Sequence, residues 1–118
     1  MSKNKNYQQM AAPVIMHYIA AHELKTSQIS YYLRKDPRFY DMRGVSKNLN
    51  SKGKDNDVIW TCFILQVAGL IRRKGKGILN ATWESTGKPM LPIDTIWRIY
   101  EANYLSLSKE ERKEWLTN

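Results

Sequence analysis

The feature that most constrains this chain is an apolar segment, NDVIWTCFILQVAG, at residues 56–69. Asp55 or Asn56 can cap a helix at its start, and Gly69 can end that helix in a left-handed conformation. One face repeats at helical spacing and is predicted to face the core, with Val58, Thr61, Cys62, Leu65 and Ala68. The opposite face is also apolar, with Ile59, Trp60, Phe63 and Val67. Because a helix that is apolar all round is normally covered on both sides, we expect other elements on either side of this segment.

Two more helices are predicted before this segment. Residues 8–22 carry apolar side chains at helical spacing, and Pro13 fits the first turn of such a helix. Residues 23–25 form a short connector or strand, after which a second helix runs until Pro37. Proline ends it because it disfavours helical geometry at the residue before it. Residues 37–55 are rich in cations and poor in aliphatic side chains, which predicts a long basic loop.

A basic hairpin is predicted after the apolar helix. Two strand-like runs, LIRR and GILNAT, are joined at residues 74–77, where glycines permit the positive φ angles of a tight turn. Strand alternation places Arg72 and Lys74 on one side and Arg73 on the other. The chain is therefore expected to be mainly α with a small β-hairpin, in the α+β class.

The remaining segments define the domain limits. Residues 1–9 are expected to be disordered, residues 10–88 to form one domain, and residues 89–118 to add a helical extension of two helices. The first helix of the extension has an apolar stripe made of Ile93, Ile96, Trp97, Tyr100 and Tyr104. This stripe must be buried, either on the outer face of the apolar helix or in a homodimer seam through Trp97, Tyr100 and Tyr104.

The net charge indicates the kind of partner. The 118 residues include 19 Lys or Arg and 11 Asp or Glu, which gives a formal net charge of +8. Residues 34–88 hold twelve of the basic residues and five of the acidic ones, so most of the excess lies in the middle of the chain. A small domain with this excess is typical of proteins that bind a polyanion.

Composition also excludes some classes of protein. No stretch approaches the roughly 20 apolar residues that span a bilayer, and the N-terminus has no apolar signal region. The lone Cys62 cannot form an internal disulfide and is expected to be a core residue in a reducing compartment. We therefore expect a cytoplasmic protein with no membrane partner.

The predicted order of helix, connector, helix, loop, helix and basic hairpin is that of a winged helix-turn-helix. Residues 55–72 resemble the N-terminal winged-helix domain of Mrr-type restriction endonucleases, with the matching positions Asn56, Val58, Trp60, Leu65, Ala68, Gly69 and Leu70. The resemblance covers residues 10–88. It implies a winged helix over these residues, to which the C-terminal extension adds two helices, and a role in restriction–modification, a mobile element or transcription regulation.

Double-stranded DNA is the expected partner. Two groups of cations can each hold a run of phosphates, with the third helix laid against the groove between them. The hairpin group is Arg72, Arg73, Lys74 and Lys76, and the loop group is Arg43, Lys47, Lys52 and Lys54. Asn56, at the start of the third helix, is one of the few side chains there that can read a base.

The other function classes have weaker signals. The formal matches to a nuclease, Asp94 with Glu111 and Lys113, or Glu23 with Lys25, lack a sheet that would bring the carboxylates together. We therefore predict no catalytic residue, no metal site and no cofactor. The alternative is a protein–protein interaction module that dimerises or docks a partner through the apolar face of the third helix and the aromatic C-terminal helix. Such association would tolerate salt, whereas DNA binding would not.

Overall fold

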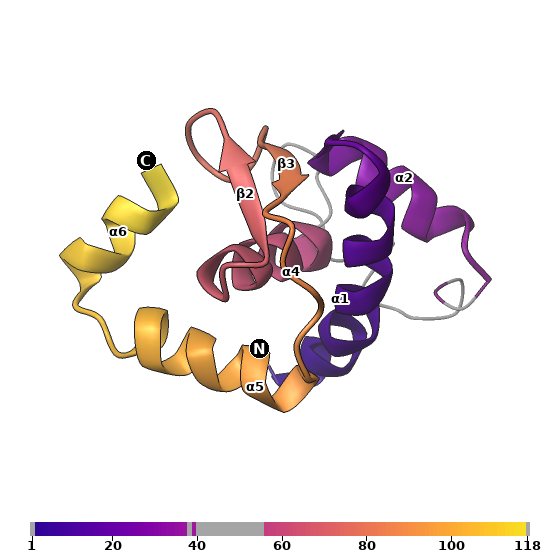
Figure 1. Cartoon of the computed structure of the whole chain (residues 1–118). Helices are drawn as coiled ribbons and strands as arrows, with labels where there is room; N and C mark the ends of the chain where they lie inside the picture. The colour runs from indigo at the N-terminus through magenta and orange to yellow at the C-terminus, as the bar shows by residue number, and fades with distance from the viewer. Residues whose placement is uncertain (1, 38, 40–55, 118) are drawn as a thin grey trace.

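The computed structural model describes residues 2–37, 39 and 56–117, with side chains from Asn6 onward. Within these residues the chain is mainly helical and carries one small antiparallel sheet, as the α+β prediction expects (Figure 1). The elements in chain order are α1 (Ser2–Ala21), β1 (Leu24–Lys25), α2 (Thr26–Lys35), α4 (Asn56–Val67), β2 (Ile71–Lys74), β3 (Thr82–Ser85), α5 (Ile93–Tyr100), the π-helical η1 (Glu101–Leu105) and α6 (Lys109–Thr117).

Helix α4 lies at the centre of the fold, and nine of its twelve residues are buried. On one face, Val58, Cys62 and Leu65 join a core cluster with residues of α1, α2 and the sheet. On the other face, Ile59 and Phe63 belong to a second cluster that includes Ile78 and Tyr104, from the hairpin loop and η1. Both sides of the apolar segment are therefore covered within the chain, as its sequence predicts.

The end of α4 follows the predicted glycine signal. Gly69 has a φ of +81°, and its N–H donates to the carbonyl of Gln66 at 2.9 Å. The N–H of Leu70 donates to the carbonyl of Leu65 at 3.1 Å. These two bonds form a Schellman motif, which satisfies the last carbonyls of the helix and turns the chain into β2.

The sheet has the strand order β1-β3-β2, so β2 is an edge strand. Leu24, Trp83 and Arg73 lie in register across the three strands, and Lys25, Thr82 and Lys74 form the next row. Trp83 is fully buried, and its Nε1 donates to Thr26 Oγ1 at 2.8 Å, which ties β3 to the start of α2. Because neighbouring rows point to opposite faces, the sheet has an inner face on the core and an outer face in solvent.

The hairpin differs from its prediction in its second strand. The partner of β2 is Thr82–Ser85, with Arg72 opposite Glu84, and not the GILNAT run at residues 77–82. Ile78 in that run is buried in the second cluster, against the outer face of α4. Because Ile78 packs against α4, residues 75–81 form a loop over this helix and do not extend the strand.

The N-terminus also differs from its prediction. Helix α1 begins at Ser2, so the expectation that residues 1–9 are disordered is wrong for residues 2–9. Tyr7 is buried and packs edge-on against Phe39, with ring centroids 5.3 Å apart. This contact anchors the early turns of the helix, and Pro13 lies inside the helix instead of starting it.

The C-terminal extension packs on its own chain. Ile96 and Trp97 of α5 are buried in the main core, while Tyr104 of η1 lies 4.8 Å from the Phe63 ring, centroid to centroid. Of the two arrangements that the sequence allows, the structure shows the stripe folded over the domain. Trp97 and Tyr104 are buried without a second copy, which removes the basis for a homodimer seam through these residues and Tyr100. No helix among the described residues has both the length and the apolar character needed to cross a bilayer.

Candidate nucleic-acid interface

The structure describes five of the nine predicted DNA-binding residues. Four of these five lie in the hairpin, namely Arg72, Arg73, Lys74 and Lys76, and the fifth is Asn56 at the start of α4. The predicted loop group lies outside the described residues, with Arg43, Lys47, Lys52 and Lys54. The geometry of the candidate site is therefore the geometry of the hairpin.

The outer face of the sheet carries two of the predicted cations. The side chains of Arg72 and Lys74 are 61% and 49% exposed, and each has one carboxylate partner. Arg72 Nε lies 2.7 Å from Glu84 Oε2, and Lys74 Nζ lies 2.9 Å from Glu23 Oε1. The hydrogen bond and the negative charge of Glu23 raise the pKa of Lys74, so this ammonium stays charged at neutral pH.

These ion pairs leave Arg72 and Lys74 able to bind a phosphate. Exposed pairs typically contribute about 0–1 kcal/mol to stability, because water already solvates both charges well. A phosphate that approaches Arg72 or Lys74 can therefore displace the carboxylate at little cost. Each cation that neutralises a phosphate also releases condensed counterions, which the internal pair does not.

The structure adds one cation that sequence reasoning missed. Lys25 in β1 is exposed and lies in the same row as Lys74, with Thr82 between them. We define the outer cationic face as Lys25, Arg72 and Lys74. The alternation of buried Leu24 and exposed Lys25 was visible in the sequence, but the pairing of β1 with β3 was not. Lys76 is also exposed and lies in the loop that follows β2.

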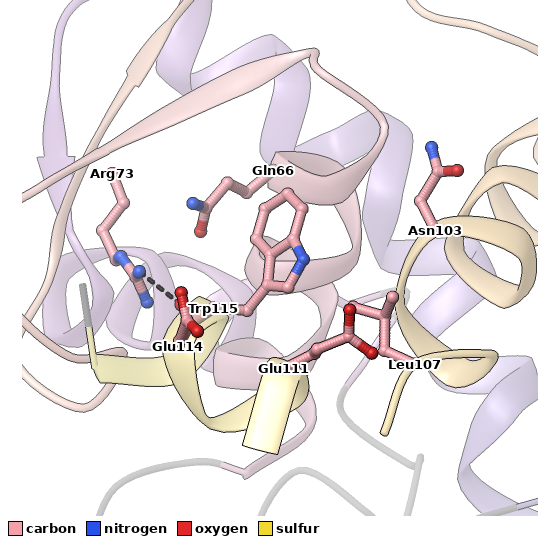
Figure 2. A pocket seen from close by; sticks show the side chains of 7 residues that line it. All are labelled: Gln66, Arg73, Asn103, Leu107, Glu111, Glu114 and Trp115. Atoms are coloured by element: carbon pink, nitrogen blue, oxygen red, sulfur yellow. Dashed lines mark hydrogen bonds between the residues drawn. The ribbon is translucent and has the colours of Figure 1, made fainter. Parts of the chain in front are cut away.

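Arg73 lies on the other side of the strand, as alternation predicts, and this separates it from the other hairpin cations. Its Nη2 donates to the backbone carbonyl of Trp115 in α6 at 2.5 Å (Figure 2). The guanidinium is partly buried there, and loss of solvation lowers the pKa of Arg73. In this arrangement Arg73 faces α6, whereas Arg72 and Lys74 face solvent, and the DNA contact of Arg73 stays a prediction.

A cleft of about 610 Å³ lies beside Arg73, between α4, β2, η1 and α6. Its lining consists of Gln66, Arg73, Asn103, Leu107, Glu111, Glu114 and Trp115, whose side chains Figure 2 shows. Two buried atoms of this lining, Gln66 Oε1 and Arg73 Nη1, have no hydrogen-bond partner among the described residues. The two glutamates add negative charge to the cleft, which opposes an anion there.

Helix α4 is largely enclosed by the rest of the chain. Its buried faces are covered by α1, α2 and the sheet on one side and by the C-terminal extension on the other. Asn56 and Gln66 are only partly exposed, at opposite ends of the helix. A helix with two apolar faces is stabilised by this burial in protein. The contact between the third helix and a DNA groove stays a prediction.

Comparisons with protein-family models, with curated proteins and with solved structures found no match to this chain. The functional conclusion therefore depends on the charge and exposure of the hairpin residues.

Proposed function

We propose that this chain is a non-catalytic, duplex DNA-binding protein of the winged-helix type, which holds the phosphate backbone with its outer cationic face and Lys76. The observation that carries the proposal is the alignment of exposed cations on one side of the sheet, Lys25, Arg72 and Lys74. The proposal of a winged helix is supported by the order of α1, β1, α2, α4 and the hairpin, in which β1 completes the sheet beside the return strand.

The binding mode follows from which groups are accessible. Phosphate contacts position a protein on the duplex without reading sequence, whereas base contacts require an element inside a groove. The hairpin offers the first kind of contact, and the covered α4 does not offer the second. We therefore expect affinity that falls steeply with salt and depends little on base sequence.

The described residues give no support to the alternative function, a protein–protein interaction module. It required an uncovered apolar face on α4 and an uncovered aromatic stripe in the C-terminal extension. Phe63 and Tyr104 from these two surfaces pack against each other in the same chain.

The test is a titration of fluorescent duplex DNA at several salt concentrations. The variant Arg72→Ala, Lys74→Ala, Lys76→Ala removes three exposed hairpin cations. Its matched control, Arg34→Ala, Lys88→Ala, Arg98→Ala, removes three exposed cations from other parts of the surface and changes the net charge equally.

The slope of log affinity against log salt measures the number of phosphate contacts. We expect its magnitude to fall by about 0.9 for each contact removed, or by up to about 2.7 in the hairpin variant. The control should keep the wild-type slope, because it loses charge but no phosphate contact. Equal losses in the two variants, or wild-type binding that tolerates salt, would overturn the proposal.

A further inference from the structure

We propose that α6 is a releasable latch on the hairpin: it occupies Arg73, and its departure gives Arg73 to the DNA phosphates. The inference rests on the proposed function, since it describes how the same phosphate-binding hairpin is regulated.

The latch is held at few points. Trp115 accepts the hydrogen bond from Arg73 through its carbonyl, and its ring lies edge-on to Phe63 with centroids 6.0 Å apart. Near the other end of α6, the Arg112 guanidinium lies 5.6 Å from the centre of the Tyr104 ring and also donates to the carbonyl of Leu105. None of the nine residues of α6 is buried. Elements with so little buried surface are the ones that open locally while the rest of a domain stays folded.

Arg73, which belongs to β2, donates a hydrogen bond to a carbonyl at the C-terminal end of α6. The last carbonyls of a helix lack partners within it and carry partial negative charge, which favours a cation nearby. The last turn of α6 contains no basic residue of its own. The hairpin supplies this cation, so docking of α6 and the position of Arg73 are physically coupled.

The closed arrangement also has costs. Arg73 gives up part of its hydration, and its Nη1 has no hydrogen-bond partner among the described residues. The same holds for Gln66 Oε1 and Arg112 Nε, which are buried near α6. A buried polar atom without a partner has lost its hydration without compensation, which destabilises the closed state. These costs offset the few favourable contacts, so the closed and open states are expected to differ little in free energy.

Opening would change what the hairpin can reach. Strand β2 is at the edge of the sheet, and Figure 1 shows α6 beside it. The end of α6 is close to the hairpin loop, because a Cβ added at Gly77 would lie 3.9 Å from the carbonyl oxygen of Leu116. Long side chains from both faces of an edge strand can extend past that edge once nothing covers it. Arg73 can then meet the same polyanion as Arg72 and Lys74.

Departure of α6 would also remove a repulsion. Glu111 and Glu114 line the cleft next to Arg73 and oppose a phosphate there. The two equilibria are linked. If release of α6 raises the affinity for DNA by some factor, DNA binding through Arg73 must favour the released state by the same factor. The hairpin would thus bind DNA weakly when latched and more tightly when released.

The main experiment deletes residues 108–118. The deleted segment contains three Lys or Arg and three Glu, so the formal net charge of the chain stays at +8 and general attraction to DNA is unchanged. We expect affinity to rise at least about fivefold, the lower end of typical coupling between sites. The salt slope should steepen by about one, since one more phosphate contact is made.

Arg73→Ala is the control that identifies the cause. In the deletion variant, Arg73→Ala should abolish the gain in DNA affinity and in salt slope. In the full chain, the same substitution should leave affinity and slope nearly unchanged. A gain that survives Arg73→Ala would overturn the latch, because another group would then be responsible.

A full-length variant guards against loss of fold. Trp115→Ala, Leu116→Ala weakens the apolar part of the latch without altering charge, and should shift affinity in the same direction by a smaller factor. Wild-type affinity in both this variant and the deletion, while the hairpin variant still loses binding, would reject the latch and leave the proposed function intact. Absence of salt-dependent binding in the wild type and in both released forms would reject the two proposals together.

Discussion

Helices α4 and α6 are of similar length, with twelve and nine residues, but they lie at opposite extremes of burial. In α4 only three residues are not buried, whereas in α6 no residue is buried. The first helix holds the two core clusters together, and the second rests on the surface through a few side chains. The contrast shows that buried surface is divided very unequally between two helices of one small domain.

The comparison also bears on DNA binding. In a winged helix the third helix is expected to carry recognition, but here that helix is the centre of the core. The exposed cations of the proposed DNA-binding surface are instead in the sheet and its loop, near α6. The following predictions test this division, in order of decreasing effect.

Cys62 should report the global stability of α4. Its thiol is fully buried, and loss of solvation raises the pKa of Cys62, so the reactive thiolate is disfavoured in the native state. A thiol reagent should therefore label the native protein at least about 10³-fold more slowly than the denatured protein, in line with typical folding equilibrium constants. Rapid labelling under native conditions would show that α4 opens locally and would break the comparison.

Phe63→Ala should destabilise the whole domain. The Phe63 ring is fully buried among Trp60, Tyr104 and Trp115 on the outer face of α4. Truncation of a buried phenylalanine typically costs about 3–5 kcal/mol, which denaturant unfolding can measure. Tyr31→Ala is the control, because Tyr31 is 56% exposed and its removal should change stability by about 0.5 kcal/mol or less.

Ser108→Ala should loosen α6 alone. Ser108 Oγ accepts the N–H of Glu111, and the Glu111 carboxylate accepts the N–H of Ser108, which together form a capping box. Loss of the cap should lower the free energy of opening of α6 by about 1 kcal/mol, measured by amide hydrogen exchange. Amides of α4 should be unaffected, and a matching loss of protection there would mean that the two helices open together.

Acid should have the smallest effect, and again on α6. Hydrogen bonds from the backbone N–H and hydroxyl of Ser108 lower the pKa of Glu111. Because the folded pKa of Glu111 lies below its unfolded pKa, the stabilisation is present above the unfolded pKa and is lost as pH falls through the folded pKa. Protection of α6 amides, corrected for intrinsic exchange, should decline over that range. Glu111→Gln should remove this pH dependence. If the protection of α6 amides still declined with pH in this variant, another group would be responsible.

Much of the local structure was predictable from the sequence. The limits of α4, its two apolar faces, the left-handed Gly69 and the Ser108 capping box all depend on residues within a few positions of one another. The opposite orientation of Arg73 relative to Arg72 also followed from strand alternation alone. Features of this kind are encoded by periodicity and capping, which act within one or two turns of the chain.

Contacts between distant segments could not be predicted in the same way. Arg73 and Trp115 are 42 positions apart, and nothing in the local sequence of either indicates the other. The pairing that brings Lys25 next to Thr82 depends on where α2 and α4 place the two strands. The early start of α1 depends in turn on the contact between Tyr7 and Phe39.

The sequence by itself determined that a helix apolar on both faces needs two covers, and that a glycine-rich basic hairpin follows it. Only the tertiary structure decided that the C-terminal extension provides the second cover. The same packing partly buries one hairpin cation, Arg73, against α6. The physical reason is that burial requires a partner surface but does not specify which one. That choice is made by the packing of the whole chain, which places Ile96 and Trp97 of α5 in the main core and Tyr104 of η1 on the outer face of α4.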